Sequence, residues 1–176
     1  MKIMRRLLIV VVMFLSVSVF IDPLRAETAS PKMQPEKSDR KMIERGRYLT
    51  KIGGCNDCHT PGYLLREGNV PEKMWLTGDM LGWRGPWGTT YAVNLRTYIA
   101  SLAEEQWIAA ARILKTRPPM PWFTLNIVYD EDLKAIYQFI RHLGPAGEPA
   151  PAYVPPDQEP KTPYALFPSP PGDARK

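Results

Sequence analysis

Five consecutive residues, Cys55-Asn56-Asp57-Cys58-His59, bring two thiols and an imidazole together at the spacing C-x-x-C-H. On one tight helical turn the two thiols lie on the same side, so that each can add to a vinyl group of a haem. The histidine that follows can then bind the iron as its proximal ligand. The sequence therefore predicts one haem c, attached covalently through Cys55 and Cys58, with His59 on the iron.

Other uses of the cysteine pair explain the residues less well. A structural zinc site needs four Cys or His ligands, and beyond the motif the chain offers only His142. A thioredoxin-like dithiol belongs at a helix start in a strand-helix-strand context, and no such pattern surrounds this pair. A simple disulfide would leave His59 without a role.

The N-terminus has the features of a targeting segment. Lys2, Arg5 and Arg6 precede an apolar stretch of 15 residues, Leu7 to Ile21, and Ala26 ends a cleavage site. This pattern is typical of a secretory signal peptide, and the stretch is shorter than the ~20 residues of a membrane-spanning helix. We expect residues 1–26 to be removed and the remainder to be periplasmic; an uncleaved segment would instead tether the protein to the membrane.

The signal segment also accounts for most of the basic charge. The chain has a formal net charge of +5, of which residues 1–26 carry +3, so that about +2 remains. The remaining sequence shows no cluster of Lys and Arg interleaved with aromatic residues. We therefore expect no nucleic-acid partner.

About 150 residues then remain, enough for one domain. Residues 27–37 are polar and are expected to be a disordered leader. Residues 38–144 are expected to form the folded module. Residues 145–176 are rich in proline, which excludes a helix or a central strand and predicts an extended or disordered tail. Two alternatives are open for this tail: it docks onto a larger subunit as an extended arm, or it is unstructured.

Helical periodicity predicts three helices, at residues 39–52, 102–115 and 131–143. Gly46 lies in the middle of the first helix, at a cost of ~1 kcal/mol relative to Ala; a close approach by another helix would explain it. The expected N-terminal caps are Ser38, Ser101 (in the capping box Ser101-Leu102-Ala103-Glu104) and Asp130. Between the first two helices, Trp75, Trp83 and Trp87 are each interpreted as core packing rather than as contacts of the haem edge.

The second axial position of the iron has four candidate ligands after the motif: Met74, Met80, Met120 and His142. His142 points away from the apolar stripe of its helix and is expected to face solvent. Met120 lies in Arg117-Pro118-Pro119-Met120-Pro121-Trp122, a stiff segment that cannot be the interior of a helix. A thioether held on such a loop is the preferred sixth ligand, while Met74, Met80 and an open position are the alternatives.

The sequence resembles class I c-type cytochromes, and among them the monohaem modules of periplasmic dehydrogenases. The resemblance covers about residues 40–144 and is carried by Gly46-Arg47-Tyr48-Leu49, Cys55 to Pro61, Tyr91-Ala92-Val93-Asn94-Leu95, Pro119-Met120-Pro121-Trp122 and Asp130 to Ile136. It implies an all-α fold, a small class I cytochrome c-like helical domain around one haem. The first and last helices would cross beside the haem, with Gly46 against Tyr137, and His59 and Met120 would be the metal ligands. Where such modules often carry an acidic or Pro-Asp stretch, this chain has Arg96-Thr97, and Arg96 could pair with a haem propionate.

These features predict an electron-transfer protein rather than an enzyme. An iron held by His59 and Met120 has no vacant position for a substrate, and a methionine ligand raises its potential relative to two histidines. The predicted partners are redox proteins, either those of a free carrier or the other subunits of a dehydrogenase. The alternative is a gas or peroxide site at an open or displaceable sixth position, although the sequence offers no distal base.

Overall fold

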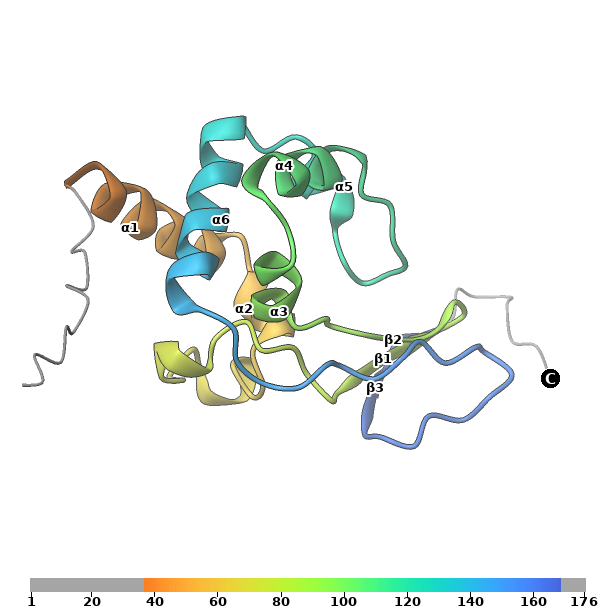
Figure 1. The fold of residues 1–176 in the computed structure, drawn as a ribbon. Helices are drawn as coiled ribbons and strands as arrows, with labels where there is room; N and C mark the ends of the chain where they lie inside the picture. The colour runs from red at the N-terminus through yellow and green to blue at the C-terminus, as the bar shows by residue number, and fades with distance from the viewer. Residues whose placement is uncertain (1–36, 169–176) are drawn as a thin grey trace, which may run out of the picture. The chain divides into compact units, whose positions relative to one another are not determined.

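The computed structural model describes residues 37–168, so the expected signal peptide and residues 27–36 of the expected leader lie outside the described residues. Its fold is predominantly helical, with one small sheet (Figure 1). No helix within residues 37–168 is long and apolar enough to cross a membrane. In chain order the elements are α1 (Lys37–Ile52), α2 (Cys55–His59), the 3-10 turns η1 (Leu64–Arg66) and η2 (Glu72–Met74), β1 (Gly82–Gly85), β2 (Gly88–Tyr91), α3 (Leu95–Ala100), α4 (Glu104–Ile113), α5 (Trp122–Asn126), α6 (Asp130–Leu143) and β3 (Tyr164–Leu166).

Helices α1 and α6 cross (Figure 1). At Gly46, α1 lies directly against the backbone of α6. A Cβ atom at this position would lie 1.9 Å from the carbonyl oxygen of Ala135 and 2.7 Å from the Cβ of Phe139. Only glycine permits such contact, which confirms the reason expected for its presence in the helix. The suggested contact with Tyr137 is wrong, because that side chain packs elsewhere and its hydroxyl donates to the carbonyl of Leu102 at 2.9 Å.

The three long helices occur where periodicity predicts them, but their first residues differ from the prediction. Ser38 lies inside the first turn of α1, and Asp130 is the first residue of α6 rather than its cap. Ser101 ends the short helix α3 instead of capping α4. The side chain of Gln106 accepts the backbone N–H of Ala103 at 2.9 Å and stabilises the start of α4. Several capping arrangements are open to one sequence, and tertiary packing selects among them.

The core lies between α1, α3, α4 and α6 and the loop that follows α2. Trp75 belongs to it, as predicted: its ring centroid lies 5.9 Å from that of Tyr63 and 6.2 Å from that of Phe139. Its indole N–H donates to the carbonyl of Val70 at 2.8 Å, so the polar end of the ring is satisfied. The largest apolar side chains that are fully buried are Phe139, Leu76, Ile99, Leu133 and Ile140.

Besides the helices, the structure contains a three-stranded sheet in the order β2-β1-β3, which was not predicted from the sequence. Strands β1 and β2 form an antiparallel hairpin in which Trp83 pairs with Thr90. Strand β3 comes from the Pro-rich tail and pairs in parallel with β1, with Ala165 opposite Trp83. The tail thus follows an extended path on its own module, because a proline-free stretch, Tyr164-Ala165-Leu166, can form a short strand.

Candidate functional site

The two cysteines and His59 lie on the short helix α2, which begins immediately after α1 ends. Gly54 separates the two helices with φ of +68°, in the left-handed region that glycine adopts without strain. A turn of two residues therefore separates α1 from α2, which presents Cys55 and Cys58 from one helical turn. Both thiols line the same cavity as the imidazole.

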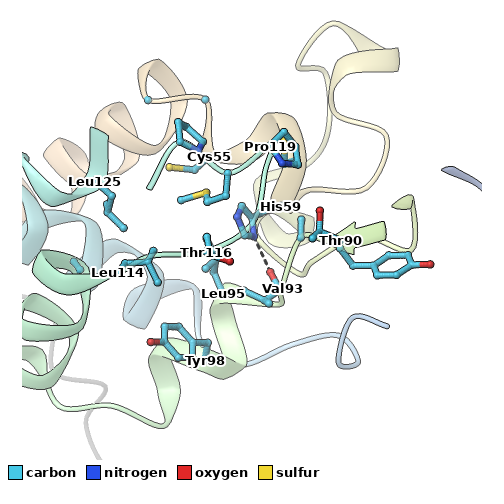
Figure 2. A pocket seen from close by; sticks show the side chains of 18 of the residues that line it. Cys55, His59, Thr90, Val93, Leu95, Tyr98, Leu114, Thr116, Pro119 and Leu125 are labelled. Atoms are coloured by element: carbon cyan, nitrogen blue, oxygen red, sulfur yellow. Dashed lines mark hydrogen bonds between the residues drawn. The ribbon is translucent and has the colours of Figure 1, made fainter. Parts of the chain in front are cut away.

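His59 is buried and has a fixed orientation. Its Nδ1 lies 2.7 Å from the carbonyl oxygen of Val93, in the loop between β2 and α3 (Figure 2). Since a carbonyl only accepts hydrogen bonds, Nδ1 carries the proton and Nε2 keeps its lone pair. Burial lowers the pKa of His59 and favours the neutral imidazole. Neutral imidazole with a free Nε2 is the form that binds a metal.

The cavity beside His59 has a volume of about 410 Å³, within the range of roughly 300–1,000 Å³ usual for ligand and cofactor sites. Its wall is mostly apolar and comes from α2, the β1–β2 hairpin, α3, α4, α5, α6 and the loop before α5. Figure 2 shows some of these residues, among them Leu95, Leu114 and Leu125. The apolar residues that line it include Val93, Leu95, Trp107, Ala110, Ala111, Leu114, Leu125, Ile136 and Ile140. Such a wall excludes water from a flat apolar ligand.

Met120 reaches this cavity from the proline-bounded loop before α5 and is half-buried there. The other candidates for the sixth ligand lie elsewhere. The side chains of Met74 and Met80 are 44% and 57% exposed, and His142 is exposed at the end of α6. The structure thus brings all four predicted site residues, Cys55, Cys58, His59 and Met120, to one cavity. Thiols, a neutral imidazole and a thioether around an apolar space are the donor set that a covalently bound haem requires.

Arg96 does not fill the role suggested for it. The residue is only 5% exposed, and its guanidinium donates to the carbonyls of Lys73 at 2.6 Å, of Gly144 at 2.5 Å and of Leu143. These contacts satisfy the last carbonyls of α6 and join that helix to the loop at Lys73. Because Arg96 is buried, binds backbone carbonyls and does not line the cavity beside His59, it is a structural residue and not a partner for a propionate.

We expect Arg96→Ala to lower the free energy of unfolding by roughly 2–4 kcal/mol, because the carbonyls of Lys73, Leu143 and Gly144 lose a charged donor. Arg96→Lys should recover part of this loss, since an ammonium can reach only some of the same oxygens. Chemical denaturation followed by circular dichroism measures both. Arg66→Ala, at an exposed arginine, is the matched control and should change stability by less than about 0.5 kcal/mol.

Two other residues on the cavity were not predicted. Arg117, immediately before the prolines, lines the cavity and is the one Arg, Lys, Asp or Glu among the described residues that do so. Trp83 also lines it, so its interpretation as plain core packing is incomplete. The Nε1 of Trp83 is buried without a hydrogen-bond partner within residues 37–168. Neither role follows from periodicity, because both depend on how the hairpin and the Met120 loop face each other.

Comparison with known proteins finds two relatives that are named as cytochrome subunits of dehydrogenases. Over 139 residues, 73% of the chain, the sequence is 30% identical to a fructose dehydrogenase cytochrome subunit of Gluconobacter japonicus. Over 118 residues, 61% of the chain, it is 27% identical to a gluconate 2-dehydrogenase cytochrome c subunit of Pantoea cypripedii. The aligned parts make up 26% and 24% of these relatives, so the chain spans about a quarter of their length. No family model and no solved structure matches.

The chain is cytochrome c-like. It resembles cytochrome subunits of dehydrogenases in sequence, and its fold is a small helical domain of the kind expected for such a protein. The predicted fold class is therefore confirmed, with the sheet as the addition described above.

Proposed function

We propose that this chain is an exported class I monohaem c-type cytochrome that transfers single electrons. Cys55 and Cys58 would hold the haem covalently, and His59 and Met120 would be its iron ligands. The observation that carries the proposal is the convergence of these four side chains on one apolar cavity, with His59 held in its metal-binding tautomer by Val93.

When bound, haem c supplies reversible one-electron chemistry at its iron. The chain itself would orient the imidazole, exclude water from the cofactor with the apolar wall, and leave part of its edge accessible. None of these tasks requires a substrate pocket, so the proposed role is electron transfer and not catalysis. Export to the periplasm is part of the proposal and depends on the N-terminal segment.

The proposed partner is a dehydrogenase, with the chain as its electron-transfer subunit or as a separate carrier that it reduces. The support is the similarity to cytochrome subunits of a fructose dehydrogenase and a gluconate 2-dehydrogenase. The chain corresponds to about a quarter of the length of each relative. It would therefore supply one cytochrome unit, whereas each relative contains further sequence beyond the aligned part.

The sixth ligand can be tested by absorption spectroscopy of the protein produced with haem c maturation machinery. We expect the oxidised protein to show the weak red band of methionine bound to ferric haem, and Met120→Ala to lose it because alanine offers no sulfur. The reduced wild-type protein should bind CO poorly and the variant rapidly.

Met74→Ala and Met80→Ala are matched controls, since both methionines are exposed, and both should keep the red band. If the wild-type protein lacks the band and binds CO rapidly, the iron has an open position, and the gas- or peroxide-binding alternative takes precedence. If one of the control variants loses the band, a methionine other than Met120 is the ligand.

A further inference from the structure

The Pro-rich segment at residues 145–167, here called the C-terminal strap, is bound along the β1–β2 hairpin. Strand β3 pairs with β1, and the N–H of Phe167 donates to the carbonyl of Arg84 at 2.7 Å. Further back in the strap, Val154 and Thr89 exchange two backbone hydrogen bonds, of 2.7 and 3.0 Å. These are the contacts of a folded element, although the composition of the strap suggests a loose tail.

Two polar side chains of the module bind further carbonyls of the strap. The guanidinium of Arg84 donates to the carbonyls of Gln158 at 2.9 Å and Pro156 at 3.3 Å, and it pairs with Glu159 at 3.2 Å. The amide of Asn94 donates to the carbonyls of Ala146 at 2.8 Å and Glu148 at 3.2 Å. Asn94 directly follows Val93, the residue whose carbonyl orients His59.

The strap touches the wall of the cavity at Trp83. The ring of Phe167 lies 6.0 Å from that of Trp83 and 5.3 Å from that of Trp87, centroid to centroid. Phe167 does not line the cavity, whereas Trp83 does. Phe167 therefore supports the cavity wall from behind, on the side away from the ligand.

The strap makes a second contact with a residue of the cavity wall, Arg117. Its guanidinium lies over the ring of Tyr153, 3.8 Å from the centroid, in cation–π geometry. The hydroxyl of Tyr153 donates to the carbonyl of Trp87 at 2.8 Å, which fixes the ring on the hairpin. A residue of the strap thus holds the one permanently charged side chain among the described residues that line the cavity.

We propose that the C-terminal strap is part of the cofactor site, where Tyr153 positions Arg117 to pair with a haem carboxylate and Phe167 holds Trp83 against the haem edge. This inference rests on the proposed haem c function. A positive charge near the haem and the exclusion of water both favour ferrous iron, which carries less positive charge than ferric iron. The strap therefore raises the reduction potential of the iron.

The test uses the full chain with haem attached and compares Tyr153→Leu and Phe167→Ala with the wild type. Haem content is measured first, by the pyridine haemochrome, and the reduction potential is then measured by spectroelectrochemical titration. We expect both variants to bind haem fully and to have lower potentials. Leu166→Ala is the matched control, because this neighbouring side chain is 73% exposed, and it should leave the potential unchanged.

A double-mutant comparison tests whether Tyr153 acts through Arg117. Arg117→Gln should lower the potential, and adding Tyr153→Leu to it should lower the potential little further, since the two residues act as one unit. Tyr153→Phe keeps the ring under the guanidinium and should retain a potential close to that of the wild type. If Tyr153→Leu is poorly folded, the Phe167→Ala and Arg117→Gln variants still test the proposal, because each removes one of the two contacts that it invokes.

Unchanged potentials in Phe167→Ala and Arg117→Gln, with full haem content, would overturn the proposal. An equal shift from Tyr153→Leu with and without Arg117 would also overturn it, because the two residues would then act independently. A wild-type protein that takes up no covalent haem would instead refute the proposed function, so that the two failures can be distinguished.

Discussion

Replacement of both motif cysteines, Cys55→Ala with Cys58→Ala, is expected to reduce covalently bound haem to background. Both thioether bonds depend on these sulfurs, and the sequence contains no other cysteine that could substitute. Either single variant should retain at most one bond and attach haem in reduced yield. Haem staining after denaturing electrophoresis and the intact mass of the protein measure the loss directly.

Asp57→Ala is the matched control for this prediction. Asp57 lies between the two cysteines but is exposed, so its removal leaves the thiols and the imidazole in place. Its haem content should equal that of the wild type. Wild-type haem content in the double cysteine variant would show that the cofactor is held in some other way and would refute covalent attachment.

The second large effect is expected at the crossing of α1 and α6. Gly46→Val should lower the free energy of unfolding by roughly 3 kcal/mol or more, because the new side chain would overlap the backbone of α6. The nearest obstacle is the carbonyl oxygen of Ala135, at 1.9 Å from the Cβ position. Backbone cannot move aside as a flexible side chain can, so the helices would have to separate.

Gly46→Ala should already be destabilising, although alanine favours a helix by ~1 kcal/mol over glycine. The direction in which Gly46→Ala changes the free energy of unfolding is therefore decisive. An increase would show that the two helices do not approach each other as described. Glu44→Ala, at an exposed position on the same helix, is the control and should be nearly neutral. Urea denaturation of the three variants provides the comparison.

The sequence predicts those parts of this protein that depend on local spacing. The haem motif is complete within five residues, and α1, α4 and α6 repeat their apolar residues over several turns. The rigid segment around Met120 is recognisable because proline restricts the backbone wherever it occurs. Gly46 is also informative from sequence alone, because a glycine within a helix indicates a close contact with another helix. The residue that it contacts was nevertheless predicted incorrectly.

Other features depend on partners that are distant in sequence. Arg96 has the charge to pair with a propionate, but its neighbours in space are carbonyls near the end of α6, more than forty residues away. The prolines of the tail exclude a helix, yet they do not reveal that Arg84 and Asn94 bind its carbonyls. Composition reports what a segment cannot form; it does not report which surface the segment covers.

The parallel pairing of β3 with β1 also determines an order of assembly. Strand β3 lies about 80 residues after β1, so we expect closing the loop between them to be among the slower steps of folding. During synthesis the cysteines emerge well before residues 164–166 do. If haem c is attached as proposed, we therefore expect its attachment to precede this pairing, and β3 to support the hairpin behind the cavity wall afterwards.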